Sequence, residues 1–114
     1  MRANGLRRAA MKNLGVLIAA CCLTHSGAGA AATTHTVAID ATEFKPVILS
    51  VKRGDRVVWV NKDPFPHTAT AEDRSFDSRS IAPGKSWSWV AKKPGEYPYM
   101  CTLHPTMKGT LIVQ

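Results

Sequence analysis

This sequence of 114 residues offers little support for disulfide bonds, membrane-spanning helices or amphipathic helices. Of its three cysteines, Cys21 and Cys22 lie near the N-terminus, so the rest of the chain holds only Cys101 and can form no internal disulfide. The longest apolar run, residues 14–23, is far shorter than the roughly 20 residues that a membrane-spanning helix needs. After residue 30, no segment repeats apolar residues at helical spacing. These absences argue against a disulfide-rich scaffold and against a helical bundle.

Acidic residues are also scarce, with eight Asp and Glu against fifteen Lys and Arg. All eight acidic residues lie beyond residue 30, whereas four basic residues lie before it, so residues 31–114 carry a net charge of +3. This mild positive charge does not predict nucleic-acid binding, because no basic run is interleaved with aromatic residues that could stack on bases. We expect instead an acidic protein partner, attracted by long-range electrostatics.

The first 30 residues have the composition of a secretory signal. Basic residues precede the apolar run, and Ala28-Gly-Ala30 follows it as a cleavage pattern. We therefore predict that residues 1–30 direct export to the periplasm and that residues 31–114 form one domain. An alternative is a lipoprotein signal, because Ile18-Ala-Ala-Cys21 resembles the bacterial lipobox. The signal would then end before Cys21, and acylation of that cysteine would anchor the protein to a membrane.

From residue 34 onward, short strand patterns alternate with turns. Strands are predicted where β-branched, aromatic or alternating apolar residues occur, at residues 35–40, 46–51, 56–61, 86–90, 97–101 and 109–114. Turn signals separate them, among them Lys52-Arg-Gly-Asp55 and Lys93-Pro-Gly-Glu96. Short strands at regular spacing indicate an all-β sandwich. Its core should contain Phe44, Trp59, Trp87, Trp89 and the valines.

Four residues form a pattern that is typical of a metal site. Cys101, His104 and Met107 follow one another at intervals of three, and His67 lies 34 positions before the cysteine. Together they supply a thiolate, two imidazoles and a thioether, a soft donor set that favours copper. Two histidines and a cysteine in one plane, with a weak axial methionine, are the ligands of blue copper electron-transfer sites. One copper ion per chain is the predicted cofactor.

Zinc is the competing metal, and it would imply a small zinc-dependent enzyme. A catalytic zinc site keeps one coordination position open and needs a general base. Here Met107 occupies the fourth position, and Asp63 is the only acidic residue near the ligands. The sequence therefore does not predict an enzyme.

The same residues resemble those of the cupredoxin family, and most closely the amicyanins. The resemblance covers about residues 34–114 and rests on Phe65-Pro-His67 and on Tyr99-Met-Cys-Thr-Leu-His-Pro-Thr-Met107. The short spacing from cysteine to methionine is that of the amicyanin loop, although Leu103 replaces the usual proline and Met100 the usual histidine. The resemblance implies a cupredoxin-like Greek-key β-sandwich whose copper ligands are His67, Cys101, His104 and Met107.

The segment from Gly54 to Asn61 resembles the cupredoxin strand that precedes the first histidine ligand. By this resemblance, Asn61 corresponds to the family's asparagine in the shell around the ligands. We expect Asn61 to fasten the Pro64–His67 loop to the loop that carries Cys101, and to donate a hydrogen bond toward the sulfur. Such bonds tune a reduction potential.

The resemblance further implies an exported blue copper protein that carries single electrons between redox partners by cycling between Cu(II) and Cu(I). The partner would be a larger dehydrogenase, cytochrome or oxidase that docks on an apolar patch formed by Phe65, Pro66, Leu103, His104 and Pro105. We expect a monomer that contacts a membrane only if Cys21 carries a lipid. An alternative is a periplasmic copper carrier or chaperone that delivers the ion itself.

Overall fold

The computed structural model describes Gly15 and residues 31–114, so the predicted cleavage pattern and the possible anchor at Cys21 lie outside the described residues. Within this part, the chain forms eight strands: β1 (Thr34–Asp40), β2 (Glu43–Lys45), β3 (Ile48–Val51), β4 (Arg56–Asn61), β5 (Thr70–Ala71), β6 (Ser86–Val90), β7 (Gly95–Cys101) and β8 (His104–Val113). The described residues include no helix that could span a membrane.

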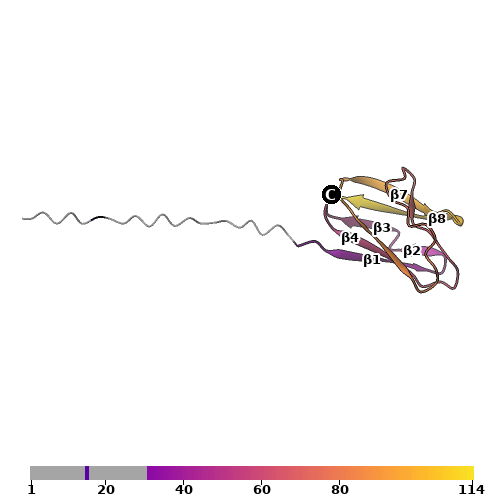
Figure 1. Ribbon diagram of the computed structural model, residues 1–114. Coiled ribbons are helices and arrows are strands. Elements are labelled where there is room, and N and C mark those ends of the chain that lie inside the picture. Colours follow the sequence, from indigo (N-terminus) through magenta and orange to yellow (C-terminus); the bar gives the residue numbers. More distant parts are fainter. Residues whose placement is uncertain (1–14, 16–30) are drawn as a thin grey trace, which may run out of the picture.

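The strands form two four-stranded sheets that pack against each other (Figure 1). The strand order is β2-β1-β4-β6 in one sheet and β3-β8-β7-β5 in the other. Most neighbouring strands are antiparallel, but β1 runs parallel to β4 and β3 runs parallel to β8. The chain crosses between the sheets several times, and the predicted all-β sandwich is confirmed.

Strand β4 shows why the sandwich forms. Its residues alternate, so that Val57, Trp59 and Asn61 are buried between the sheets while their neighbours are partly or fully exposed. Trp59 lies at the centre of the core, with its ring centroid 5.6 Å from those of Trp87 in β6 and Tyr99 in β7. Burial of each such side chain stabilises the fold by about 1.5–3 kcal/mol. As predicted, Trp59 belongs to the core, whereas Trp87 packs against it while remaining partly exposed.

Two strands were not predicted from the sequence, because they are too short to show a pattern. β2 has three residues and is held by its antiparallel pairing with β1. β5 has two residues and is held by the pairing of Thr70 with Met100 and of Ala71 with Tyr99 in β7. Both strands are therefore fixed by their partners rather than by their own composition.

The last strand is longer than predicted, since β8 begins at His104 rather than at Gly109. Gly109 itself is required by close packing. A Cβ atom at this position would lie 2.5 Å from Cζ of Tyr99, so the tyrosine ring covers the glycine directly. This contact seats β8 tightly against β7 just below the turn that joins them.

The sandwich has two distinct ends. The turn between β7 and β8 lies at one end, and the C-terminus lies at the other (Figure 1). Because β1 and β4 are parallel, Asp40 and Asn61 reach the first end together, whereas Thr34 and Arg56 lie at the second. The predicted ligand residues gather at the first end.

Candidate metal centre

Three of the predicted ligands converge at the end of the sandwich that holds the β7–β8 turn. His67 comes from the loop after β4, Cys101 ends β7 and His104 begins β8, and one donor atom of each lies within 4.8 Å of the other two. The Sγ atom of Cys101 is 3.7 Å from Nδ1 of His67 and 3.8 Å from Nδ1 of His104. His67 and Cys101 are 0% exposed, whereas His104 is partly exposed. Both imidazoles thus direct Nδ1 at the sulfur.

These distances suit a single ion of the first transition row. Bonds from zinc, a typical ion of this size, to nitrogen and sulfur measure about 2.0–2.3 Å. In a trigonal plane, with an angle of about 120° between such bonds, nitrogen and sulfur donors are roughly 3.8 Å apart. The two Nδ1–Sγ distances, 3.7 and 3.8 Å, agree with this value. A thiolate beside two imidazoles is also the donor chemistry that copper prefers, so the residues fit copper.

A two-residue turn, Thr102–Leu103, brings Cys101 and His104 together. Cys101 and His104 pair with each other at the end of the β7–β8 ladder. Sequence reasoning placed both side chains toward one ion because of this short turn, and the structure has the turn where it was expected.

An irregularity in β8 accounts for the position of Met107. Cys101 pairs with His104, but the preceding residue Met100 pairs with Lys108, so residues 105–107 bulge out of the ladder. Proline has no N–H group to contribute to a ladder and is tolerated at bulges, which suits Pro105. The bulge ends with the Met107 side chain buried at the ligand end of the core.

Thr68 joins the two ligand loops. Its backbone N–H donates a hydrogen bond to Sγ of Cys101, at 3.2 Å. Its hydroxyl oxygen accepts a hydrogen bond from the backbone N–H of Thr102, at 2.9 Å. The loop that carries His67 is therefore held directly against the turn after Cys101. Sequence reasoning missed Thr68, whose only signal is its position next to a predicted ligand.

Asn61 is fully buried beside the site, but the predicted hydrogen bond from Asn61 to the sulfur of Cys101 is wrong. Its side-chain amide donates instead to the carbonyl oxygens of Phe65, at 2.7 Å, and Ile81, at 2.9 Å. Asn61 thus fastens the Pro64–His67 loop to the segment at Ile81 rather than to the Cys101 loop. Asn61 ends β4, directly before this loop, and its amide bonds the loop at Phe65. The hydrogen bond to the sulfur comes instead from the backbone N–H of Thr68, the residue after His67.

Asp63, noted in the sequence only as a nearby acid, contacts a predicted ligand directly. Its Oδ2 atom is 2.8 Å from Nε2 of His67, and its carboxylate also accepts the backbone N–H groups of Ala41 and Thr42. Burial raises the pKa of Asp63, but the hydrogen bonds from Thr42, His67 and Ala41 outweigh burial and hold that pKa below its usual range. The carboxylate is therefore ionised and holds the ring of His67 by its outer nitrogen.

The predicted docking residues lie on the surface at this end of the molecule. Phe65 is 59% exposed and Leu103 is 52% exposed, and both are among the few large apolar side chains that face solvent in the described residues. Pro66 and Pro105 are also exposed, and the partly exposed His104 lies next to Pro105 in the chain. Isolated apolar residues on a surface need no explanation, but these are close neighbours of His67 and His104 in the chain.

A scan of protein families matches the model of a cupredoxin-like domain to residues 13–113. Among curated proteins, a plastocyanin from Scenedesmus fuscus is 37% identical over 87 residues, which cover 65% of this chain and 89% of the plastocyanin. Among solved structures, a mutant amicyanin in the Cu(I) form is similar with a TM-score of 0.67 and 27% identity, over 71% of this chain and 82% of the amicyanin.

A second structural match concerns an enzyme. A copper-containing nitrite reductase from Thermus scotoductus is similar with a TM-score of 0.67 and 31% identity. The match covers 71% of this chain but only 22% of the reductase chain. The similarity is therefore to one portion of that enzyme, and most of the reductase chain lies outside the match.

Proposed function

Because the chain belongs to the cupredoxin family, close to the amicyanins, we propose that it is an exported blue copper protein that shuttles single electrons between redox partners. His67, Cys101 and His104 would hold one copper ion in a trigonal plane, and Met107 would be the weak axial ligand. The bound ion would supply a one-electron centre that alternates between Cu(II) and Cu(I). The observation that carries this proposal is the pair of matched Nδ1–Sγ distances, 3.7 and 3.8 Å, around a buried cysteine.

The protein's own contribution is to keep this geometry in both copper states. The sulfur of Cys101 is held by Thr68, the ring of His67 by Asp63, and the His67 loop by Asn61. All three of these supporting residues are buried, and the loops they fix connect strands of the rigid sandwich. Little rearrangement would then accompany electron transfer, as the task of a carrier demands.

Electron exchange would take place through His104, the one partly exposed ligand. The apolar patch of Phe65, Pro66, Leu103 and Pro105 around it offers a small docking surface of the kind that weak, fast redox encounters use. The net charge of +3 on residues 31–114 favours approach by an acidic redox partner. Export to the periplasm is proposed from the signal composition of residues 1–30, with a lipid anchor at Cys21 as the alternative.

Delivery of copper is a different function that the same ligands could serve. A carrier that hands over its ion needs access to it, whereas His67 and Cys101 are 0% exposed and Met107 is buried. This burial favours retention of the metal. Catalysis by this chain alone is disfavoured, because Met107 would fill the coordination position that a catalytic metal site keeps open.

The test of the proposed function is the visible spectrum of the copper-loaded protein. We expect an intense thiolate-to-Cu(II) charge-transfer band that bleaches on reduction. Cys101→Ser should abolish this band while leaving the sandwich folded, which circular dichroism would check. Retention of the band in that variant would rule out Cys101 as the ligand. Dialysis against a chelator separates the two functions, since an electron carrier should keep its copper while a delivery protein should lose it within minutes.

A further inference from the structure

Asp63 connects the β1–β2 turn to the predicted metal ligand His67 through its carboxylate. Its carboxylate accepts hydrogen bonds from the backbone N–H groups of Ala41, at 2.7 Å, and Thr42, at 2.8 Å. It also lies 2.8 Å from Nε2 of His67, and its own backbone N–H donates to Oδ1 of Asn61, at 2.9 Å. Three donors thus converge on one buried carboxylate, which has almost no freedom to turn away from His67.

The turn beneath Asp63 has a conformation that its own sequence does not favour. Ala41 and Thr42 form the two-residue connection between β1 and β2, and their φ angles are +51° and +60°. Two-residue hairpin turns of this type prefer glycine, asparagine or aspartate, and a positive φ is especially unfavourable for a β-branched residue such as threonine. The carboxylate of Asp63 accepts both N–H groups of this turn, so the turn and the aspartate hold each other in place.

We infer that Asp63 is a positioning residue that holds His67 with Nδ1 toward Cys101 and lowers the reduction potential of the copper centre, an inference that rests on the proposed function. With Nδ1 facing the sulfur, Nε2 carries the proton and donates a hydrogen bond to the carboxylate. A carboxylate partner makes an imidazole a stronger donor to a metal and fixes the orientation of its ring. Its negative charge also favours Cu(II) over Cu(I), because attraction grows with the charge of the ion and is poorly screened in a buried site.

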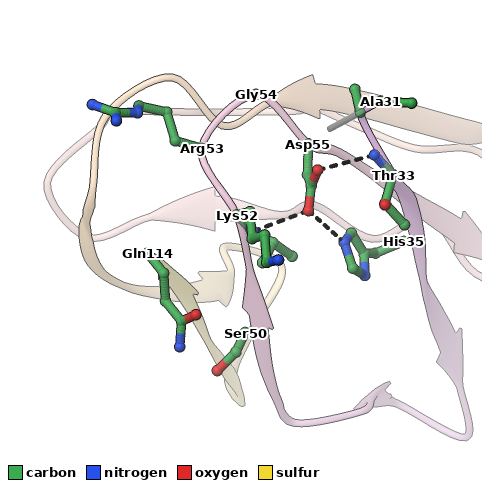
Figure 2. A pocket seen from close by; sticks show the side chains of 11 residues that line it. Ala31, Thr33, His35, Ser50, Lys52, Arg53, Gly54, Asp55 and Gln114 are labelled. Carbon is green, nitrogen blue, oxygen red and sulfur yellow. Dashed lines mark hydrogen bonds and ion pairs between the residues drawn. The ribbon is translucent and has the colours of Figure 1, made fainter. Parts of the chain in front are cut away.

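The chain contains its own control for this role. Asp55 is buried like Asp63, and its carboxylate accepts two backbone N–H groups, those of Thr33 and Lys52, both at 2.9 Å. Its Oδ2 atom lies 2.9 Å from Nε2 of His35. Figure 2 shows the three contacts of this carboxylate as dashed lines. The arrangement is the same, but it belongs to the opposite end of the β1–β4 pair. Loss of charge at Asp55 would disturb the fold in a comparable way without reaching the metal centre.

The experiment compares Asp63→Asn with Asp55→Asn in the copper-loaded full chain, by voltammetry at neutral pH. In Asp63→Asn, the amide keeps the size of the side chain but removes the charge and turns one acceptor into a donor. We expect the ratio of Cu(I) to Cu(II) at a fixed potential to rise about tenfold, which is an upward shift of about 59 mV for one electron. Asp55→Asn should have the wild-type potential. Asp63→Glu, which retains the charge, should have a potential closer to that of wild type than to that of Asp63→Asn.

The two failures are separable. A wild-type protein that binds copper without the charge-transfer band would overturn the proposed function. A wild-type protein with the band, whose potential moves no further in Asp63→Asn than in Asp55→Asn, would overturn the role of Asp63 alone.

A measurement on the unmodified protein decides the matter if Asp63→Asn does not fold. Proton NMR of the reduced, diamagnetic protein should show the Nε2 proton of His67 exchanging slowly with solvent, because it is buried and bound to the carboxylate. A His67 ring that carries its proton on Nδ1, or whose Nε2 proton exchanges as fast as that of an exposed histidine, would contradict the inference.

Discussion

At each end of the β1–β4 strand pair, the carboxylate of a buried aspartate accepts hydrogen bonds from two backbone N–H groups. Its Oδ2 atom lies 2.8–2.9 Å from Nε2 of a histidine. At one end, the residues are Asp55 and His35, and Asp55 ties the start of β1 to the turn before β4 (Figure 2). At the other end, the residues are Asp63 and His67, and Asp63 ties the β1–β2 turn to the loop after β4. The two arrangements are similar in chemistry and in geometry.

What differs is the surroundings of the remaining ring nitrogen. Nδ1 of His67 faces Sγ of Cys101, Nδ1 of His104 faces the same sulfur, and His67 is fully buried. The side chain of His35 is 24% exposed and borders a pocket of about 330 Å³ whose lining includes the polar residues Ser50, Lys52, Arg53 and Gln114. In the described part of the chain, His35 and Asp55 do not belong to any group of three or more His, Cys, Asp or Glu side chains that could hold a metal ion. A carboxylate can hold a histidine anywhere in a fold, and only the convergence of further soft donors makes the pair part of a metal centre.

The largest expected difference between the two ends lies in copper binding. His67→Ala should abolish the charge-transfer band at one equivalent of copper, because it removes one of the three donors in the plane. His35→Ala should keep the band at full intensity. The measurement is a copper titration of both variants followed in the visible range. A blue His67→Ala protein, or a colourless His35→Ala protein, would break the distinction between the ends.

The next difference concerns the thioether of Met107, which is buried at the same end of the sandwich as the other predicted ligands. Met107→Gln should keep copper and lower the reduction potential, because a harder oxygen donor favours Cu(II). We expect a shift of roughly 59 mV, equivalent to a tenfold change in the ratio of the two states. The matched control is Met100→Gln, at a partly exposed position on β7 that is not a predicted ligand. If voltammetry finds no difference between the two variants, Met107 is a core residue and not the axial ligand.

The smallest expected effect concerns how ionised Asp55, the partner of His35, contributes to the free energy of unfolding at low pH. The hydrogen bond from Thr33, followed by those from His35 and Lys52, lowers the pKa of Asp55 from 3.8 to about 2. A lowered pKa in the folded state means that ionised Asp55 stabilises the fold above about pH 4, and that this contribution is lost as pH falls toward 2. The free energy of unfolding of metal-free wild type should therefore exceed that of Asp55→Asn at pH 5 and approach it at pH 2.

Urea unfolding of both proteins at several pH values would measure this difference. His35 and the peptide groups of Thr33 and Lys52 are the groups that face the carboxylate, and all remain in the variant. A difference between the two proteins that stays constant from pH 5 to pH 2 would mean that the charge of Asp55 contributes nothing to stability.

Much of the fold could be predicted from the sequence where side chains alternate. The boundaries of β4 and β6 were correct, because β4 is rich in β-branched and aromatic residues and β6 alternates serine with tryptophan. The boundaries failed where pairing rather than composition decides. β2 and β5 exist only because β1 and β7 offer them partners, and β8 begins early because the turn after Cys101 is so short.

The candidate site divides in the same way. His67, Cys101, His104 and Met107 were recognised because their donor atoms and spacing are specific to a metal. The residues that support them were missed or misplaced, since Thr68 acts through its backbone N–H and Asp63 through contacts with residues 41 and 42. Asn61 was assigned to the correct region but to the wrong partner. Contacts between distant segments have no signature in a single sequence, whereas the chemistry of ligands does.

The most direct test of the account is a titration of the metal-free protein with Cu(II), followed by visible absorption and electron paramagnetic resonance. We predict that one equivalent of copper produces an intense charge-transfer band and a single copper signal, and that one electron per protein removes both reversibly. Copper that binds without this band, or a band that needs more than one equivalent to develop, would contradict the assignment of a single thiolate-bound copper centre to His67, Cys101, His104 and Met107.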